Sequence, residues 1–323
     1  MKIVICEFMD EPSVNELRRN FDVVYDPKLV DRREDLQQQL ADAQGLVVRN
    51  RTQVRGELLA AAPQLRVVGR LGVGLDNIDV AGCEARQIAV IPATGANALA
   101  VAEYVIASTM VLLRGASLSS AAVAAGEWPR PQLSDGRESA GKTLGLVGFG
   151  GIGRLTATLA RALGMRVIAY DPMLAPEAPV WSETGVGCVG LDGLLAEADA
   201  VSLHVPLTDA TRALLDAARI GAMKPGAVLV NTARGGIVDE AALAQALREG
   251  RLGGAALDVF EREPLAAGSP LAGVPNLILT PHIAGVTRES NQRVSAMIAD
   301  KVSALLLASQ PTEQSCPPLI LNA

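Results

Sequence analysis

The sequence predicts an α/β protein with two doubly wound parallel-sheet domains. Two series of short apolar runs, separated by segments of helical period, extend along its 323 residues. Strands that alternate with helices are typical of a parallel sheet with helices on both faces. At about 100–200 residues per domain, this length allows two domains, each with its own core.

The first hundred residues contain the first series, in which β-rich runs alternate with polar helical stretches. The expected strands are Lys2–Cys6, Asp22–Tyr25, Gly45–Val48, Leu65–Gly69 and Ile88–Ile91. The expected helices are Pro12–Arg19, Arg33–Ala43 and Gly56–Ala61. Together they predict one parallel sheet in this part of the chain.

An alanine-rich segment follows and predicts one long helix from about Asn97 to Gly126. Alanine is the best helix former, and its small side chain suits a closely packed connector or interface. The most lipid-like part, Tyr104–Leu113, is shorter than the roughly 20 residues of a membrane span. The stretch Glu127–Gly141 is rich in proline, glycine and charge, which is typical of a loop.

The second series begins at Thr143 and predicts a second parallel sheet. Its expected strands are Thr143–Val147, Arg166–Ala169, Ala200–Leu203, Ala227–Asn231, Gly254–Leu257 and Asn276–Leu279. Its expected helices are Gly151–Leu163, Leu191–Ala196 and Glu240–Glu249. A last helix, Arg288–Ala308, precedes a proline-rich tail.

Composition excludes several classes of protein. A net charge of −6 and a pI near 5.1 argue against a nucleic-acid binder, which neutralises phosphates with basic residues. The chain does not open with a secretory signal pattern. The four cysteines, Cys6, Cys83, Cys188 and Cys316, have neither metal-ligand nor disulfide spacing. We therefore expect a soluble, cytoplasmic protein with no metal site and no membrane segment.

The strongest local signal is a glycine-rich turn between a strand and a helix. The strand Thr143–Val147 leads directly into Gly148-x-Gly150-x-x-Gly153. Glycines allow a tight turn and a close approach to a pyrophosphate, and the helix N-terminus offers unpaired N–H groups. Asp171 ends the next strand, where it would bond the ribose hydroxyls of NAD and repel the 2′-phosphate of NADP. Such a turn also serves plain packing, but strand, helix and acid together predict an NAD site.

Three candidate catalytic side chains lie just past strand ends. Arg234, Glu263 and His282 each follow a different strand of the second series, at the rim where doubly wound sheets bind ligands. A guanidinium can bind a carboxylate, and an imidazole oriented by a carboxylate can carry a proton. Each could instead be an ordinary loop residue, Arg234 paired with Asp239 for example. The other histidine, His204, follows a strand and precedes Pro206, so a structural role competes with a catalytic one.

These segments resemble the D-isomer-specific 2-hydroxyacid dehydrogenases, in the D-3-phosphoglycerate dehydrogenase branch. The resemblance covers nearly the whole chain and includes Gly69–Asp79, Gly126–Trp128 and His204–Thr208. It implies a Rossmann cofactor domain, residues 99–286, inserted into a flavodoxin-like substrate domain of residues 1–98 and 287–323. It also implies a homodimer whose interface is built by the alanine-rich helix and the adjoining loop.

The resemblance implies a role for each site residue. Arg234 would anchor the substrate, His282 would be the acid–base group, and Glu263 would be its partner. The backbone of Val73 and Gly74 would receive the substrate carboxylate. The residues implied to bind NAD are Gly148, Gly150, Gly151, Ile152, Gly153, Asp171, His204, Val205, Pro206, Thr232, Ala233, Asp258 (on the nicotinamide carboxamide) and Ala284.

The substrate is expected to carry two anionic groups. The phosphoglycerate branch uses an arginine at the position of Arg49 for the distal anion, and Arg51 stands close by in sequence. The stretch Arg49–Thr52 and the segment Gly126–Arg130 also resemble bacterial (S)-sulfolactate dehydrogenases. Arginines bind a sulfonate and a phosphate in similar ways, so 3-phosphoglycerate and (S)-3-sulfolactate both remain candidate substrates. The alternatives are a hydroxypyruvate or glyoxylate reductase and a non-enzymatic NADH-sensing corepressor.

Overall fold

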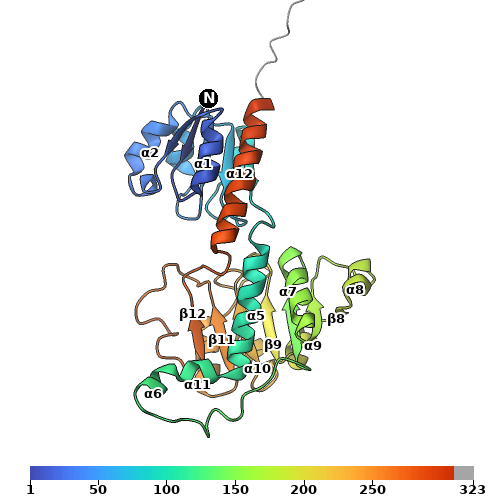
Figure 1. Cartoon of the computed structure of the whole chain (residues 1–323). Coiled ribbons are helices and arrows are strands. Elements are labelled where there is room, and N and C mark those ends of the chain that lie inside the picture. Colours follow the sequence, from blue (N-terminus) through green and yellow to red (C-terminus); the bar gives the residue numbers. More distant parts are fainter. Residues whose placement is uncertain (309–323) are drawn as a thin grey trace, which may run out of the picture. The chain divides into compact units, whose positions relative to one another are not determined.

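The computed structural model describes residues 1–308, so Cys316 and the proline-rich tail lie outside the described residues. The chain divides into two compact units (Figure 1). Unit 1 comprises Met1–Asn97 and the chain from Arg288 onward, and unit 2 comprises Ala98–Thr287. The second unit is thus an insertion in the first.

Unit 1 is built on a five-stranded parallel sheet in the order β2-β1-β3-β4-β5. This is the strand order of flavodoxin, which confirms the expected fold. Its strands are β1 (Lys2–Ile5), β2 (Asp22–Tyr25), β3 (Gly45–Val48), β4 (Val67–Arg70) and β5 (Ala89–Pro92). Its helices are α1 (Glu11–Arg18), η1 (Leu29–Asp31), α2 (Arg33–Leu40), α3 (Gly56–Ala60), α4 (Val80–Ala85) and α12 (Arg288–Ala308).

The returning helix α12 packs directly on the sheet of unit 1. With α1 it covers one face, while α2, α3 and α4 cover the other. Gly69 in β4 allows a close approach, because a Cβ there would lie 2.7 Å from a methyl group of Ile298. The C-terminal segment therefore completes the core of unit 1.

Unit 2 is built on a seven-stranded parallel sheet in the order β12-β11-β10-β9-β6-β7-β8. The strand order reverses beside β6, as in a Rossmann fold, and this confirms the expected fold class. Its strands are β6 (Thr143–Val147), β7 (Arg166–Tyr170), β8 (Gly187–Cys188), β9 (Ala200–Leu203), β10 (Val228–Asn231), β11 (Gly254–Leu257) and β12 (Leu277–Leu279). Every expected strand is present, and strand ends differ from the prediction by at most two residues.

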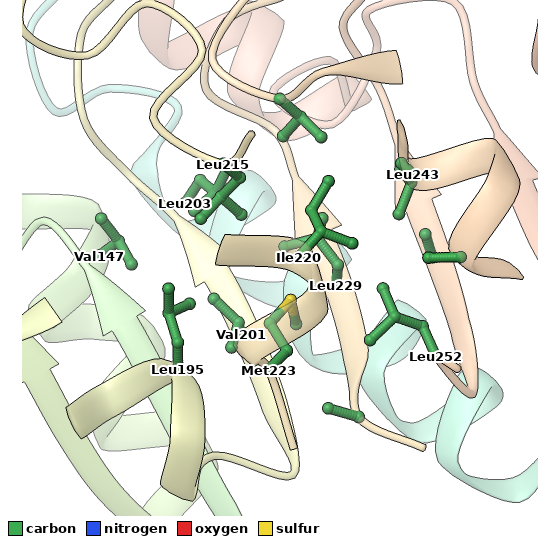
Figure 2. Packing of buried hydrophobic residues seen from close by; sticks show 14 of the residues in the cluster. Val147, Leu195, Val201, Leu203, Leu215, Ile220, Met223, Leu229, Leu243 and Leu252 are labelled. Atoms are coloured by element: carbon green, nitrogen blue, oxygen red, sulfur yellow. The ribbon is translucent and has the colours of Figure 1, made fainter. Parts of the chain in front are cut away.

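Apolar layers cover both faces of the unit 2 sheet. One layer contains side chains of α5 (Ala98–Arg114), α7 (Gly151–Ala162) and α8 (Pro179–Thr184). The other contains side chains of α9 (Leu191–Glu197), α10 (Ala217–Ala222) and α11 (Glu240–Arg248). Figure 2 shows this second layer, in which Leu195, Ile220 and Leu243 lie beside residues of β9 and β10.

The prediction of one helix from Asn97 to Gly126 was wrong. Helix α5 ends at Arg114, and Gly115 with φ of 70° precedes the short helices η2 (Ala116–Ser119) and α6 (Ser120–Ala124). A left-handed glycine is a common helix terminator. The Arg137 N–H also donates a hydrogen bond to the Leu113 carbonyl oxygen, which in a longer helix would accept from the next helical turn. A loop distant in sequence thus supplies the hydrogen bond that ends the helix.

The short elements α4, α8, β8 and α10 were not predicted. Each has at most six residues, too few to show a clear hydrophobic period. Across residues 1–308, none of the helices combines the length and the apolarity that a membrane crossing requires.

Candidate active site

The glycine-rich turn connects β6 to α7 and has two kinds of glycine. Gly148 has φ of 98°, and a Cβ there would lie 2.7 Å from the His204 carbonyl oxygen. A Cβ on Gly153 would lie 2.5 Å from the Gly148 carbonyl oxygen. A Cβ on Gly150 or Gly151 would meet nothing within 4 Å. Two glycines are thus required by the protein's own packing, and two leave open space at the N-terminus of α7, where a pyrophosphate fits.

Asp171 follows β7 and braces this turn. Its Oδ2 accepts a hydrogen bond of 2.8 Å from the Phe149 N–H, and its Oδ1 accepts one of 2.9 Å from the Met173 N–H. The carboxylate therefore has a fixed position beside the glycine turn. Each oxygen retains a lone pair for a further donor, such as a ribose hydroxyl.

Two buried polar atoms past β9 and β10 lack a hydrogen-bond partner within residues 1–308. They are His204 Nε2 and Thr232 Oγ1. Burial lowers the pKa of His204 to about 4, so the ring is neutral at pH 7. Buried polar groups are normally paired, so both atoms are consistent with a bound polar ligand. Together with the open glycine turn, they fit NAD.

All the predicted cofactor residues lie at one edge of the unit 2 sheet. Because the strands are parallel, their carboxyl ends share that edge. The residues follow β6 (Gly148, Gly150, Gly151, Ile152, Gly153), β7 (Asp171), β9 (His204, Val205, Pro206), β10 (Thr232, Ala233), β11 (Asp258) and β12 (Ala284).

The loops that carry Arg234 and Glu263 are in close contact. A Cβ on Gly235, next to Arg234, would lie 1.7 Å from the Phe260 carbonyl oxygen. Only glycine allows this approach. The Arg234 guanidinium donates to the Ala233 carbonyl oxygen at 2.6 Å. This packing holds the arginine at the same sheet edge as the acid–base candidates.

Glu263 and His282 form a direct pair. Glu263 Oε2 lies 2.8 Å from His282 Nδ1, and Glu263 Oε1 accepts a hydrogen bond of 3.1 Å from the Phe260 N–H. A carboxylate accepts, so Nδ1 carries the proton in the neutral ring and Nε2 has a lone pair. The side chain is 37% exposed. His282 can therefore take a proton at Nε2 from a bound substrate while Glu263 stabilises the resulting cation.

Asp258 holds the loop that carries His282. Its buried carboxylate accepts from the Thr280 hydroxyl at 2.6 Å and from the Ile283 and Ala284 N–H groups at 2.8 and 2.7 Å. The Asp258 carbonyl also accepts from the His282 N–H at 2.8 Å. These contacts support the unusual positive φ of His282, 56°. The implied contact of Asp258 with the nicotinamide carboxamide stays a prediction.

Sequence reasoning missed Thr280 and Tyr104 as parts of this site. The Thr280 hydroxyl gives its single proton to Asp258, so the Tyr104 hydroxyl, 2.6 Å away, donates to Thr280. This chain links α5 to the His282 loop. Only the position of Thr280 directly before Pro281 and His282 could have drawn attention to it.

The candidate substrate residues of unit 1 lie past β3 and β4. Arg49 is half-buried; its Nη2 donates to Asn291 Oδ1 at 2.7 Å, and its guanidinium lies 5.7 Å from the centre of the Phe8 ring. Arg51 is exposed and forms an ion pair with Asp31. The two arginines therefore point to different partners.

Val73 and Gly74 lie in the loop after β4. Within residues 1–308, their backbone N–H groups donate no hydrogen bond. Val73 is 37% exposed, and the loop lies at the carboxyl edge of the sheet. Unpaired N–H groups of this kind can receive a carboxylate.

Known proteins share both the sequence and the fold. Residues 106–284 match the NAD-binding domain of the D-isomer specific 2-hydroxyacid dehydrogenases. The chain is 56% identical over 300 residues to an (S)-sulfolactate dehydrogenase from Chromohalobacter salexigens, covering 93% of this chain and 96% of that one. It is 38% identical over 302 residues to a D-3-phosphoglycerate dehydrogenase from Archaeoglobus fulgidus, covering 94% of this chain but only 56% of that one.

The fold is shared with a solved structure as well. The crystal structure of a protein from Thermus thermophilus has a TM-score of 0.85 at 34% identity, covering 97% of this chain and 99% of that one. The match thus extends over both units. The chain belongs to the D-isomer-specific 2-hydroxyacid dehydrogenases, NAD-dependent oxidoreductases that act on a CH–OH group.

Proposed function

We propose that this enzyme transfers a hydride between NAD and C2 of a small 2-hydroxy acid with a second anionic group, of the (S)-3-sulfolactate or 3-phosphoglycerate type. The observation that carries the chemistry is the Glu263–His282 pair, 2.8 Å apart, with the histidine Nε2 left for the substrate. The second anion is supported by Arg49, a half-buried guanidinium past β3. The sulfolactate dehydrogenase relative, matched over 96% of its length, favours a sulfonate.

In the oxidation direction, neutral His282 accepts the proton of the substrate C2 hydroxyl at Nε2. Glu263, hydrogen-bonded at Nδ1, stabilises the imidazolium that forms. Bound NAD supplies the hydride acceptor, C4 of its nicotinamide ring. In reduction the imidazolium returns the proton to the carbonyl oxygen of the 2-oxo acid.

The remaining groups bind and orient. In unit 2, Arg234 is proposed as the substrate anchor. In unit 1, the N–H groups of Val73 and Gly74 are proposed to receive a carboxylate, and Arg49 the distal anion. A guanidinium binds a carboxylate, phosphate or sulfonate through parallel N–H donors. Arg51 is a weaker candidate, because its guanidinium is occupied by Asp31.

For the cofactor, we propose that the open glycine turn holds the pyrophosphate and Asp171 the adenosine ribose. The unpaired His204 Nε2 and Thr232 Oγ1 would meet polar atoms of NAD. Asp171 favours NAD over NADP because its charge repels a 2′-phosphate.

The substrate is tested by NADH oxidation with sulfopyruvate, 3-phosphohydroxypyruvate, hydroxypyruvate and glyoxylate, measured side by side. We expect kcat/KM to be highest for one of the two dianionic acids. A higher value for hydroxypyruvate or glyoxylate would replace the proposal by the simple reductase. Tight NADH binding with no turnover of any of the four would favour a sensor.

We also propose that the enzyme is a homodimer and works in the cytoplasm. Large apolar side chains are exposed on α5 and the segment that follows it, including Met110, Val123 and Trp128, the last 76% exposed. Exposed apolar patches commonly mark interfaces. The free thiols of Cys6, Cys83 and Cys188 are typical of a reducing compartment. Sedimentation analysis of the wild type and Trp128→Asp tests the dimer.

A further inference from the structure

A buried carboxylate lies beneath the loop that carries Arg49. Glu7 is the second residue past the end of β1, which pairs with β3, and is only 4% exposed. Its Oε1 accepts from the Arg49 and Thr52 N–H groups at 2.8 and 3.1 Å, and its Oε2 accepts from the Arg51 N–H at 3.1 Å. One side chain thus satisfies three backbone donors of the loop.

A buried amide side chain donates hydrogen bonds to two carbonyl oxygens of the same loop. Asn77 is 5% exposed, and its Nδ2 donates to the Thr52 carbonyl at 2.7 Å and to the Arg49 carbonyl at 3.3 Å. The loop belongs to no helix or strand, so these two side chains replace the hydrogen bonds that regular structure would provide. We call Glu7 and Asn77 the loop clamp.

The loop clamp fixes the backbone positions from which the Arg49 and Arg51 side chains extend. Arg49 leaves the clamped backbone toward Asn291 of α12 and the ring of Phe8. Arg51, two residues later, leaves it toward Asp31 at the surface. A guanidinium whose backbone is already ordered loses less conformational entropy when it binds an anion.

We propose that Glu7 is a positioning residue for substrate recognition, which fixes the Arg49–Thr52 loop so that Arg49 is preorganised for the distal anion of the substrate. This inference rests on the proposed function of Arg49. It assigns to Glu7 an effect on the KM of dianionic substrates, with little effect on kcat or on NADH binding.

The test compares Glu7→Gln with the wild type on sulfopyruvate and hydroxypyruvate. Glutamine keeps the volume but replaces one acceptor oxygen by an NH2 group, and an NH2 group cannot accept a hydrogen bond. The side chain then no longer satisfies all three N–H donors of the loop. We expect KM for sulfopyruvate to rise about tenfold, the effect of losing one or two buried hydrogen bonds. KM for hydroxypyruvate should change by less than about twofold, and amide hydrogen exchange should accelerate at residues 49–52.

The matched control is Glu16→Gln, because Glu16 is an exposed carboxylate on α1 of the same unit. This variant should leave kcat and KM for both sulfopyruvate and hydroxypyruvate unchanged. Asn77→Asp tests the clamp from its other side, because a carboxylate cannot donate to the two loop carbonyls. It should reproduce the Glu7→Gln phenotype, and it serves as the test if Glu7→Gln does not fold.

The outcomes separate this inference from the proposed function. Arg49→Gln should abolish the preference for sulfopyruvate; if it does not, the role proposed for Arg49 is wrong. If Arg49→Gln abolishes the preference while both clamp variants keep it, Glu7 is not a positioning residue and the proposed function stands. An equal loss of kcat on both substrates in the clamp variants would also overturn the inference, since it indicates general structural damage.

Discussion

The Arg49 loop of unit 1 and the His282 loop of unit 2 are held by the same device. In each unit a buried carboxylate just past one strand, Glu7 after β1 or Asp258 after β11, holds the loop that follows the neighbouring strand, β3 or β12. Each carboxylate accepts three hydrogen bonds. Loops at the carboxyl edge of a parallel sheet leave backbone N–H groups unpaired, and a carboxylate satisfies several at once.

The two loops differ in what else they contact. One of the donors to Asp258 is a side-chain hydroxyl, that of Thr280, and its loop carries a histidine paired with a second carboxylate, Glu263. Glu7 accepts from three backbone N–H groups, and its loop carries arginines. The shared device thus satisfies the backbone of each loop, while the residue that the loop carries distinguishes the proposed roles, proton transfer for His282 and anion binding for Arg49. Substitutions in the two loops should accordingly affect different kinetic constants.

The largest effect is expected for His282→Ala. Without the imidazole no group accepts the hydroxyl proton, so kcat should fall about 10³-fold or more, while the Kd for NADH stays within about twofold. Steady-state kinetics and NADH fluorescence titration measure the two quantities. Retention of wild-type turnover would remove His282 as the acid–base group and with it the contrast between the loops.

Asp258→Asn should lower kcat about 10²-fold, in contrast to the KM effect of Glu7→Gln. The amide cannot accept from both the Thr280 hydroxyl and two N–H groups, so the loop relaxes and the strained φ of His282 is lost. Kinetics of both variants on the same substrate make the comparison. Equal kcat losses in the two variants would mean that the loops do not have separate roles.

A pH experiment distinguishes the units, because both histidines of the chain lie in unit 2. Burial lowers the pKa of His204 from 6.5 to about 4, so between these values the unfolded state binds more protons than the folded one. The stability that neutral, buried His204 allows is fully present above pH 6.5. The free energy of unfolding then decreases as the pH is lowered, by about 2 kcal/mol at pH 5. Hydrogen exchange at pH 7 and 5 should show this loss in unit 2. His204→Gln should abolish it, and an unchanged pH dependence in that variant would contradict the assignment.

The smallest effect is expected for Thr280→Val, which removes the hydroxyl between Tyr104 and Asp258. The variant keeps the backbone contacts of Asp258, so kcat should fall only about five- to tenfold and stability by about 1 kcal/mol. Tyr104→Phe is the matched control, since it leaves the Thr280–Asp258 bond intact. A loss in Thr280→Val as large as that in Asp258→Asn would mean that the hydroxyl, not the backbone, positions the loop.

Local patterns were sufficient to predict most of the fold and to select the candidate catalytic side chains. Buried parallel strands such as β3 and β11 are uninterrupted apolar runs, and such runs are visible in sequence. Arg234 and His282 could be singled out because each stands just past such a run. The glycine turn could be read because its glycines, strand and acid lie within one short segment.

Tertiary contacts decided the rest. Helix α5 ends where the Arg137 N–H donates to the Leu113 carbonyl oxygen, and no pattern within the alanine-rich segment predicts that hydrogen bond. Glu7 and Arg49 are 42 residues apart, and Tyr104 and Thr280 are 176 apart. Strand pairing alone makes Glu7 the neighbour of the Arg49 loop and Asp258 the neighbour of the His282 loop.

By itself, the sequence predicted the longer strands and the glycine turn, because each depends on hydrophobic period or on residues adjacent in the chain. It also made Glu263 and His282 candidates, because each stands past a predicted strand. Only the tertiary structure decided which carboxylates hold which loops and that Arg49 contacts Asn291 while Arg51 pairs with Asp31. Those choices depend on hydrogen bonds between distant segments, whose partners become neighbours only when the sheets assemble.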